Sequence, residues 1–181
     1  MKITSYIKLL PFVFVIAFFS CSGSEEEPQG TPNNPSEMME QELDDAPDFS
    51  LETTTGAAID ASQFDDKNLV IFFFGYGCPP CRGIGADVES KLHQAFKDNS
   101  EFAIIGADQW QGNNAGVDDF AEFTGITFPL GTKGAAMARD FGTTYDRLVV
   151  VNKEGKIIYR GNSIVKNNLD EVVEIVSDLL N

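Results

Sequence analysis

Three stretches of the chain are apolar at nearly every position. They cover residues 69–74, 102–107 and 148–151. A strand buried on both faces of a sheet has this continuous pattern, whereas a strand with one face in water alternates apolar and polar residues. The three runs therefore predict the inner strands of one central sheet.

Helical spacing separates these apolar runs. Ile84, Val88, Leu92 and Phe96 recur every four residues and form one apolar stripe on a helix over residues 82–99. The other predicted helices cover residues 117–123, 135–141 and 169–180. Strands that alternate with helices predict an α/β domain whose mixed sheet has helices on both faces.

Shorter strands are predicted at both ends of this domain. Residues 48–51 alternate, residues 55–56 form a turn and residues 57–60 return, so the domain opens with a β-hairpin extension. A turn at residues 152–155 leads the last inner strand back into a strand at residues 156–159.

The N-terminus has the layout of a secretory signal peptide. Lys2 and Lys8 accompany an apolar run at residues 9–19, which is too short to favour a transmembrane helix. A small residue and then Cys21 follow, which resembles a bacterial lipobox. We expect residues 1–20 to be removed and Cys21 to carry lipid, anchoring the protein in the cell envelope, facing the periplasm or the cell surface. An uncleaved N-terminal anchor is the alternative.

The segment after the lipobox differs in composition from the rest of the chain. Residues 21–46 are rich in acidic residues and proline, contain no basic residue and lack apolar periodicity. Such a segment buries too little apolar surface to fold alone, so we expect a tether. The folded domain is then expected over residues 47–181, which is long enough for one core.

Charge and cysteine content exclude several classes of function. The chain has 13 basic and 28 acidic residues, with a formal net charge of −15. This balance argues against binding nucleic acid or docking on an anionic membrane, which both need positive charge. Three cysteines are too few for a disulfide-stapled scaffold, and with Cys21 assigned to lipid one pair remains, Cys78 and Cys81.

The remaining pair forms the sequence Cys78-Pro79-Pro80-Cys81, where the run at residues 69–74 gives way to a helix. The unpaired N–H groups and the dipole at a helix N-terminus favour an anion. They lower the pKa of a cysteine there, and the thiolate is the reactive form. The arrangement predicts a thiol–disulfide site.

This strand, motif and helix, with the closing ββα unit, resembles the thioredoxin superfamily. More narrowly, it is similar to extracytoplasmic thiol–disulfide oxidoreductases of the TlpA/ResA type within the redoxin (AhpC/TSA-like) group. The segments that carry the resemblance are residues 46–51, 72–82, 128–130, 138–142 and 149–157.

The resemblance implies a thioredoxin-like fold and a division of roles between the cysteines. Cys78 would attack the substrate and Cys81 would resolve the mixed disulfide, while Pro79 and Pro80 restrict the loop between them. It also implies protein thiols and disulfides as substrates, a redox partner that recharges the pair, and no cofactor.

Three positions depart from the family pattern. The tryptophan that usually precedes the first cysteine is Gly77. Trp110 could cover the site from another loop, and its alternative role is packing. The buried acid of thioredoxins is replaced by Phe72, which we expect in the core. The cis-proline before the third inner strand is replaced by Asp146, in a loop expected to be trans. Asp146 could face the cysteines as proton acceptor for Cys81, or it could form a surface pair with Arg147.

Other functions remain open at this point. A thiol peroxidase would need threonine three residues before the reactive cysteine, and that residue is Gly75. A zinc site would need two more ligands, and the single histidine, His93, is expected to face solvent. The pair could also be a static disulfide in a binding module. The direction of exchange and the oligomeric state are not readable.

Overall fold

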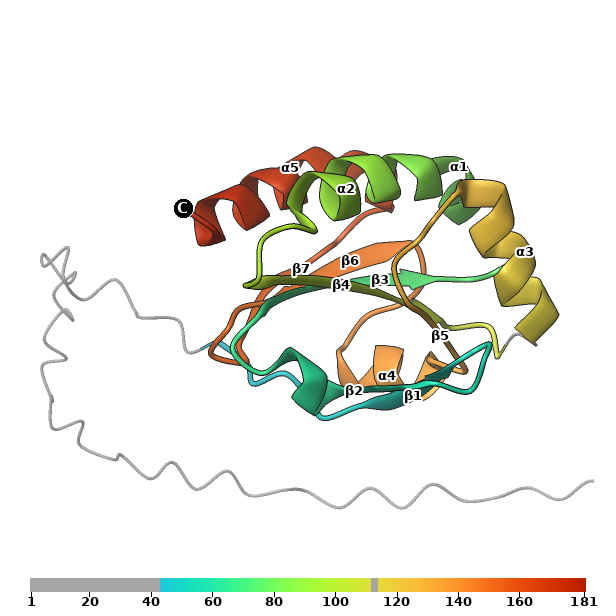
Figure 1. Ribbon diagram of the computed structural model, residues 1–181, viewed down its shortest axis with the longest axis horizontal. Coiled ribbons are helices and arrows are strands. Elements are labelled where there is room, and N and C mark those ends of the chain that lie inside the picture. Colours follow the sequence, from blue (N-terminus) through green and yellow to red (C-terminus); the bar gives the residue numbers. More distant parts are fainter. Residues whose placement is uncertain (1–42, 112–113) are drawn as a thin grey trace, which may run out of the picture. The chain divides into compact units, whose positions relative to one another are not determined.

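A computed structural model describes residues 43–111 and 114–181, which build a seven-stranded mixed sheet between helices (Figure 1). The strands are β1 (Ser50–Thr53), β2 (Ala58–Asp60), β3 (Asn68–Phe74), β4 (Phe102–Asp108), β5 (Leu130–Thr132), β6 (Arg147–Val151) and β7 (Ile157–Arg160). Their order across the sheet is β2-β1-β5-β4-β3-β6-β7.

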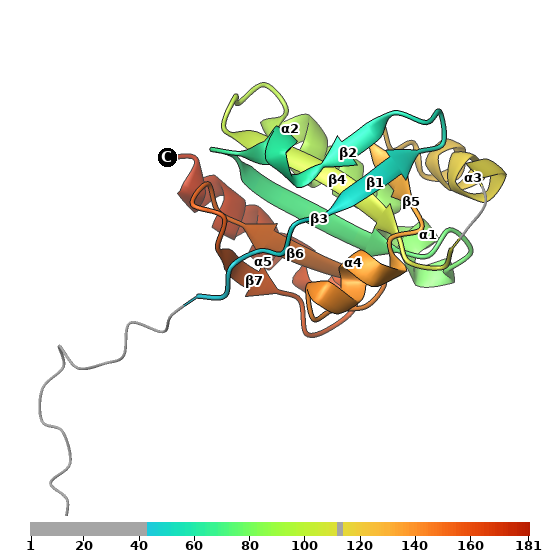
Figure 2. The same cartoon turned by 90° about the horizontal axis from the view of Figure 1, so that it is seen from below.

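The middle of the sheet consists of the three strands that the apolar runs predicted. β3 pairs parallel with β4 and antiparallel with β6, and β4 pairs parallel with β5. The predicted hairpin β1–β2 extends one edge, and β7 pairs with β6 at the other (Figure 2). The α/β fold with a mixed central sheet and an N-terminal hairpin is therefore confirmed.

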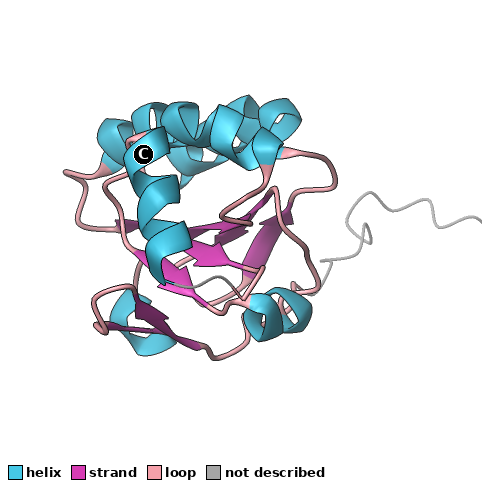
Figure 3. Cartoon of the chain, turned by 90° about the vertical axis from the view of Figure 1, so that its right-hand side faces the viewer, coloured by secondary structure: helices cyan, strands magenta, loops and turns pink. Residues whose placement is uncertain are grey.

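Helices cover both faces of this sheet, as predicted (Figure 3). On one face lie α1 (Pro79–Val88), the π turn η3 (Glu89–His93), α2 (Gln94–Phe96), α3 (Asn114–Thr124) and α5 (Val165–Leu179). On the opposite face lie α4 (Ala135–Asp140) and the 3₁₀ turn η2 (Ala61–Phe64).

Alternate residues of β3 point into two separate cores. Val70, Phe72 and Phe74 belong to the cluster beneath α1, α3 and α5, which also contains both cysteines of the motif. The intervening residues of β3 pack with α4 and the hairpin in a second cluster. Because every residue of β3 is buried, the strand reads as one continuous apolar run.

Two helices differ from the sequence prediction in ways that concern the site. The helix expected over residues 82–99 begins at Pro79 and contains the π turn η3, where Glu89 is buried. The helix expected from residue 169 begins at Val165, where the side chain of Asp146 from a distant loop accepts a hydrogen bond from the first N–H. The burial of Glu89, which bonds Thr127, and the contact between Asp146 and Val165 join residues far apart in the chain. They therefore leave no local sequence signal.

The N-terminal part of the described chain lies along β7. The main chain of Asp44 accepts from the N–H of Ile157 at 2.9 Å, and Asp44 also pairs with Arg160. Residues 1–20 and Cys21, the predicted signal peptide and lipid site, lie outside the described residues. Within residues 43–111 and 114–181, no helix has the length and apolarity needed to span a membrane.

Candidate redox site

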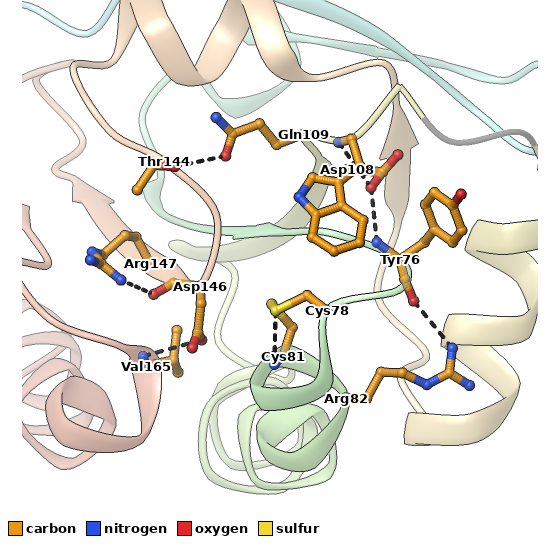
Figure 4. Close-up of a disulfide and its surroundings, with 11 residues drawn as sticks. Tyr76, Cys78, Cys81, Arg82, Asp108, Gln109, Thr144, Asp146, Arg147 and Val165 are labelled. Atoms are coloured by element: carbon orange, nitrogen blue, oxygen red, sulfur yellow. Dashed lines mark hydrogen bonds between the residues drawn. A yellow bond between two sulfur atoms is a disulfide. The ribbon is translucent and has the colours of Figure 1, made fainter.

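The register of the sheet brings three loops to one edge. Phe74 at the end of β3 is paired with Asp108 at the end of β4, and Phe73 is paired with Arg147 at the start of β6. The loop that leads to the cysteines, the loop after β4 and the loop that ends in Asp146 therefore meet there (Figure 4).

A disulfide joins Cys78 and Cys81 at this edge, with their Cα atoms 5.3 Å apart. Cys78 is the N-cap of α1, and its Sγ accepts a hydrogen bond from the N–H of Cys81 at 3.3 Å. Pro79 and Pro80 are the first two helical residues, where proline is tolerated because those N–H groups have no helical partner. Only 1% of Cys78 and 0% of Cys81 is exposed in this oxidised state.

Asp108 and Arg82 hold the loop in front of the cysteines. Oδ1 of the buried Asp108 accepts from the N–H groups of Tyr76 at 3.0 Å and Trp110 at 3.3 Å. Arg82 of α1 donates to the carbonyl oxygen of Tyr76 at 3.1 Å and pairs with Asp119 of α3 at 2.9 Å. Asp108 was not predicted from the sequence, although its position directly after the apolar run at residues 102–107 was an available signal.

Trp110 fills the space left by the glycines before Cys78. A Cβ added to Gly75 would lie 2.5 Å from Cε2 of Trp110, and one added to Gly77 would lie 3.1 Å from its Cζ3. The indole makes edge-to-face contacts with Tyr76 and Tyr145 and stays 41% exposed. An aromatic ring thus lies on the Gly77 loop although it comes from the β4 loop, as the sequence allowed.

Phe72 and Asp146 occupy different environments. Phe72 is fully buried beside Phe74 and Phe120, so this position belongs to the core, as expected. Asp146 is 3% exposed, so the alternative of a surface pair with Arg147 is wrong. Arg147 instead donates to the main-chain oxygen of Asp146 at 2.8 Å.

The loop of Asp146 has its own backbone geometry. Within residues 43–111 and 114–181 no peptide bond is cis, so the loop is trans, as predicted. Asp146 has φ +55°, in the left-handed region that non-glycine residues rarely adopt. Its carboxylate Oδ1 accepts from the N–H of Val165 at 3.2 Å, whereas Oδ2 is buried and has no hydrogen-bond partner among the described residues. Burial raises the pKa of Asp146, against opposing contributions from Val165 and Arg147.

A further buried carboxylate, Glu89, was not identified from the sequence. Oε1 accepts from Thr127 Oγ1 and Gln94 Nε2, both at 2.6 Å, and Oε2 accepts from the Thr127 N–H at 3.0 Å. Nδ1 of His93 lies 3.1 Å from Oε1, and only 20% of that side chain is exposed, so the expectation that His93 faces solvent is wrong. Burial alone raises the pKa of Glu89, but the hydrogen bonds outweigh it and lower the value from 4.5 to about 2. The Glu–His spacing of four on one helix was an available signal for half of this cluster.

The described part of the chain has no group of three or more His, Cys, Asp or Glu side chains that could hold a metal ion. The chemistry available at this edge is that of the cysteine pair, the helix N-terminus and the two buried acids Asp108 and Asp146.

Known proteins resemble this chain in sequence. A protein-family model described as Redoxin matches residues 41–178. The thioredoxin-like protein YneN of Bacillus subtilis is 25% identical over 118 residues, which cover 65% of this chain and 69% of that protein. The thiol–disulfide oxidoreductase ResA of the same organism is 24% identical over 116 residues, which cover 63% of each chain.

Solved structures show the same fold. The solution structure of a putative protein disulfide isomerase from Bacteroides thetaiotaomicron aligns with a TM-score of 0.68 and 28% identity. The alignment covers 75% of this chain and 87% of that one. The chain therefore belongs to the Redoxin family, as a thioredoxin-fold thiol–disulfide oxidoreductase of the TlpA/ResA type.

Proposed function

We propose that this protein exchanges disulfides with protein thiols through Cys78 and Cys81, with Cys78 as the nucleophile and Cys81 as the resolving thiol. The observation that carries the proposal is the position of Cys78 as the N-cap of α1. Its sulfur accepts from a helix N–H, and the same contact and the helix dipole would stabilise a thiolate there.

The exchange takes two steps when the dithiol form reduces a substrate. The Cys78 thiolate attacks one sulfur of the substrate disulfide, which forms a mixed disulfide and releases the other substrate sulfur as a thiolate. Cys81 then loses its proton and attacks Sγ of Cys78, which releases the second substrate thiolate and leaves the Cys78–Cys81 disulfide. Substrate oxidation is the same sequence in reverse.

The proposed location follows from the N-terminal sequence. Residues 1–20 would be cleaved as a lipoprotein signal peptide and lipid on Cys21 would anchor the chain. The acidic segment after Cys21 would tether the domain outside the cytoplasm, and its last residues, from Asp44 on, are held against β7. A redox partner in the same envelope compartment would then recharge the cysteine pair. Labelled palmitate should be incorporated into the parent chain and not into Cys21→Ser, and a parent chain without label would contradict the lipid anchor.

The experiment that tests the activity is a redox titration of the full chain in detergent against glutathione, with Cys21→Ser to remove the third thiol. The fluorescence of Trp110, the single tryptophan, should report the state of the pair because its indole lies against Gly77, next to Cys78. A potential near −270 mV, about that of thioredoxin, would indicate a reductant, and one near −120 mV, about that of DsbA, an oxidant.

Two further results complete this test. The Cys81→Ser variant should accumulate a mixed disulfide with a substrate protein, whereas Cys78→Ser should not. A potential below about −300 mV together with slow reduction by mild thiols would mean a structural disulfide. In that case the proposed exchange activity is wrong and the fold serves as a binding module.

A further inference from the structure

Asp146 lies between the start of β6, the start of α5 and the buried cluster that contains the cysteines. It directly precedes β6, and its side chain accepts from Val165, the first residue of α5. Val165 belongs to the same buried cluster as Cys78 and Cys81, and α5 packs against α1. Figure 4 accordingly draws Asp146 among the residues that surround the disulfide.

The backbone at Asp146 is held in an unfavourable conformation. A φ of +55° costs a non-glycine residue about 1 kcal/mol, and such strain is concentrated at functional sites. The hydrogen bond from Arg147 to the main-chain oxygen and the bond from Val165 to the side chain hold this conformation. The fold therefore keeps the carboxyl group of Asp146 inside the protein against a local cost.

The two oxygens of this carboxyl group are treated differently. Oδ1 accepts a hydrogen bond from the N–H of Val165, whereas the buried Oδ2 has no hydrogen-bond partner among the described residues. An unsatisfied buried oxygen costs about 1–3 kcal/mol, and native proteins contain few of them. In the disulfide state neither cysteine has an S–H group that could donate to this oxygen.

We infer that Asp146 is the proton acceptor for Cys81, and that its unpaired Oδ2 is satisfied only when reduction creates the Cys81 thiol. This inference deepens the proposed exchange function and rests on it. It also gives the residue at the usual cis-proline position a chemical role that replaces the acid missing at Phe72.

The proton transfer accompanies the second step of the exchange. In the mixed disulfide, Cys78 is bonded to the substrate sulfur and Cys81 is a thiol. The Asp146 carboxylate takes the proton of Cys81 as its sulfur attacks Sγ of Cys78, and the substrate leaves as a thiolate. The protonated Asp146 then returns its proton to the departing thiolate or to water, so charge and protons balance.

The other charged groups around the disulfide are already engaged. Arg82 pairs with Asp119, Asp108 accepts from the main chain of Tyr76 and Trp110, and Arg147 bonds the main chain of Asp146. Burial raises the pKa of Asp146, which brings it closer to that of a thiol and makes it a better matched base.

The test is a stopped-flow reaction of the reduced full chain, carrying Cys21→Ser, with the disulfide of thionitrobenzoate. Attack by Cys78 releases the first thionitrobenzoate, and resolution by Cys81 releases the second. Asp146→Asn keeps a side-chain oxygen for Val165 and suits a positive φ, but it cannot accept the proton. We expect this variant to slow the second phase by about 100-fold, as for loss of a general base, and to leave the first phase close to that of the parent chain.

The matched control is Asp178→Asn, which removes an equal charge from the exposed face of α5, about 20 Å further along the helix. It should change neither phase. The pH profile gives a second test. With Asp146 as the base, the second phase of the parent chain rises and then levels off as Asp146 ionises, and the Asp146→Asn variant lacks this step.

The outcomes separate the inference from the function on which it rests. If Asp146→Asn resolves as fast as the parent, or if its second phase has the same pH profile as that of the parent, Asp146 is not the acceptor. Either result leaves the exchange function intact. Loss of the first phase in the parent chain would instead overturn the function itself.

Discussion

Glu89 and Asp146 are both buried acids, yet the protein shifts their pKa values in opposite directions. Glu89 accepts from Thr127, Gln94 and His93, and its pKa falls to about 2. Asp146 has one hydrogen bond to its carboxylate, and its pKa rises. Burial opposes ionisation at both sites, so the number of donors decides the direction.

Glu89 and Asp146 differ as an acid that stabilises the fold differs from an acid that can accept a proton. A fully bonded carboxylate like Glu89 fixes η3 to the segment before β5 and is a poor base, because its proton affinity is low. A carboxylate with an unpaired oxygen and a raised pKa, like Asp146, destabilises the disulfide form but can accept a proton. The same residue class therefore serves the fold in one place and, we propose, the reaction in the other.

The largest effect is expected from removing the bonded acid. Glu89→Ala removes the charged acceptor of three hydrogen bonds from Thr127 and Gln94, and should lower the free energy of unfolding by about 3 kcal/mol in urea denaturation. The exposed Glu122→Ala on α3 is the control and should change it by less than about 0.5 kcal/mol. Equal effects of the two substitutions would mean that the cluster contributes no specific stability.

The pH dependence of the Glu89 contribution should follow its lowered pKa. Its stabilising effect is complete above the unfolded value of 4.5 and is lost as pH falls toward the folded value of about 2. The stability gap between the parent chain and Glu89→Gln should therefore shrink by about 2 kcal/mol from pH 6 to pH 2, allowing for the partial solvent contact of Glu89. A gap that stays constant over this range would contradict the lowered pKa.

The sequence predicted those features of the fold and site that depend on local pattern. The continuous runs of β3, β4 and β6 and the position of Cys78 at a helix start follow from residues close together in the chain. The contacts of Asp146 with Val165 and of Glu89 with Thr127 join residues 19 and 38 positions apart. Such contacts leave no periodic signal, so the early start of α5 and the burial of Glu89 were not predicted. Asp146 could be singled out only because it replaces an expected proline, and its burial required the structure.

Removing one donor should move Glu89 part of the way toward the behaviour of Asp146. Thr127→Val deletes the hydroxyl that donates to Oε1 at 2.6 Å but keeps the main-chain N–H that donates to Oε2. We expect a loss of about 1.5 kcal/mol in urea denaturation and a higher pKa of Glu89 by NMR titration of its carboxyl carbon. Thr55→Val, at an exposed turn, is the control and should leave both quantities unchanged. An unaltered pKa of Glu89 in Thr127→Val would show that the hydroxyl bond does not contribute to the low value.

The smallest effect on stability is expected at Asp146, and its pH dependence should have the opposite sign. Below the unfolded pKa of 3.8 the carboxyl group is neutral in both states and carries no charge penalty. As pH rises through the raised folded pKa, the parent chain loses stability that the neutral Asp146→Asn does not lose. The variant should therefore gain about 1 kcal/mol relative to the parent between pH 3 and pH 7, measured by urea denaturation of the oxidised form. In the reduced form this gain should be smaller, because the Cys81 thiol then pairs with Oδ2. A gain of equal size in both redox forms would mean that Oδ2 stays unpaired in the dithiol state, and the proton would have to leave Cys81 by another path.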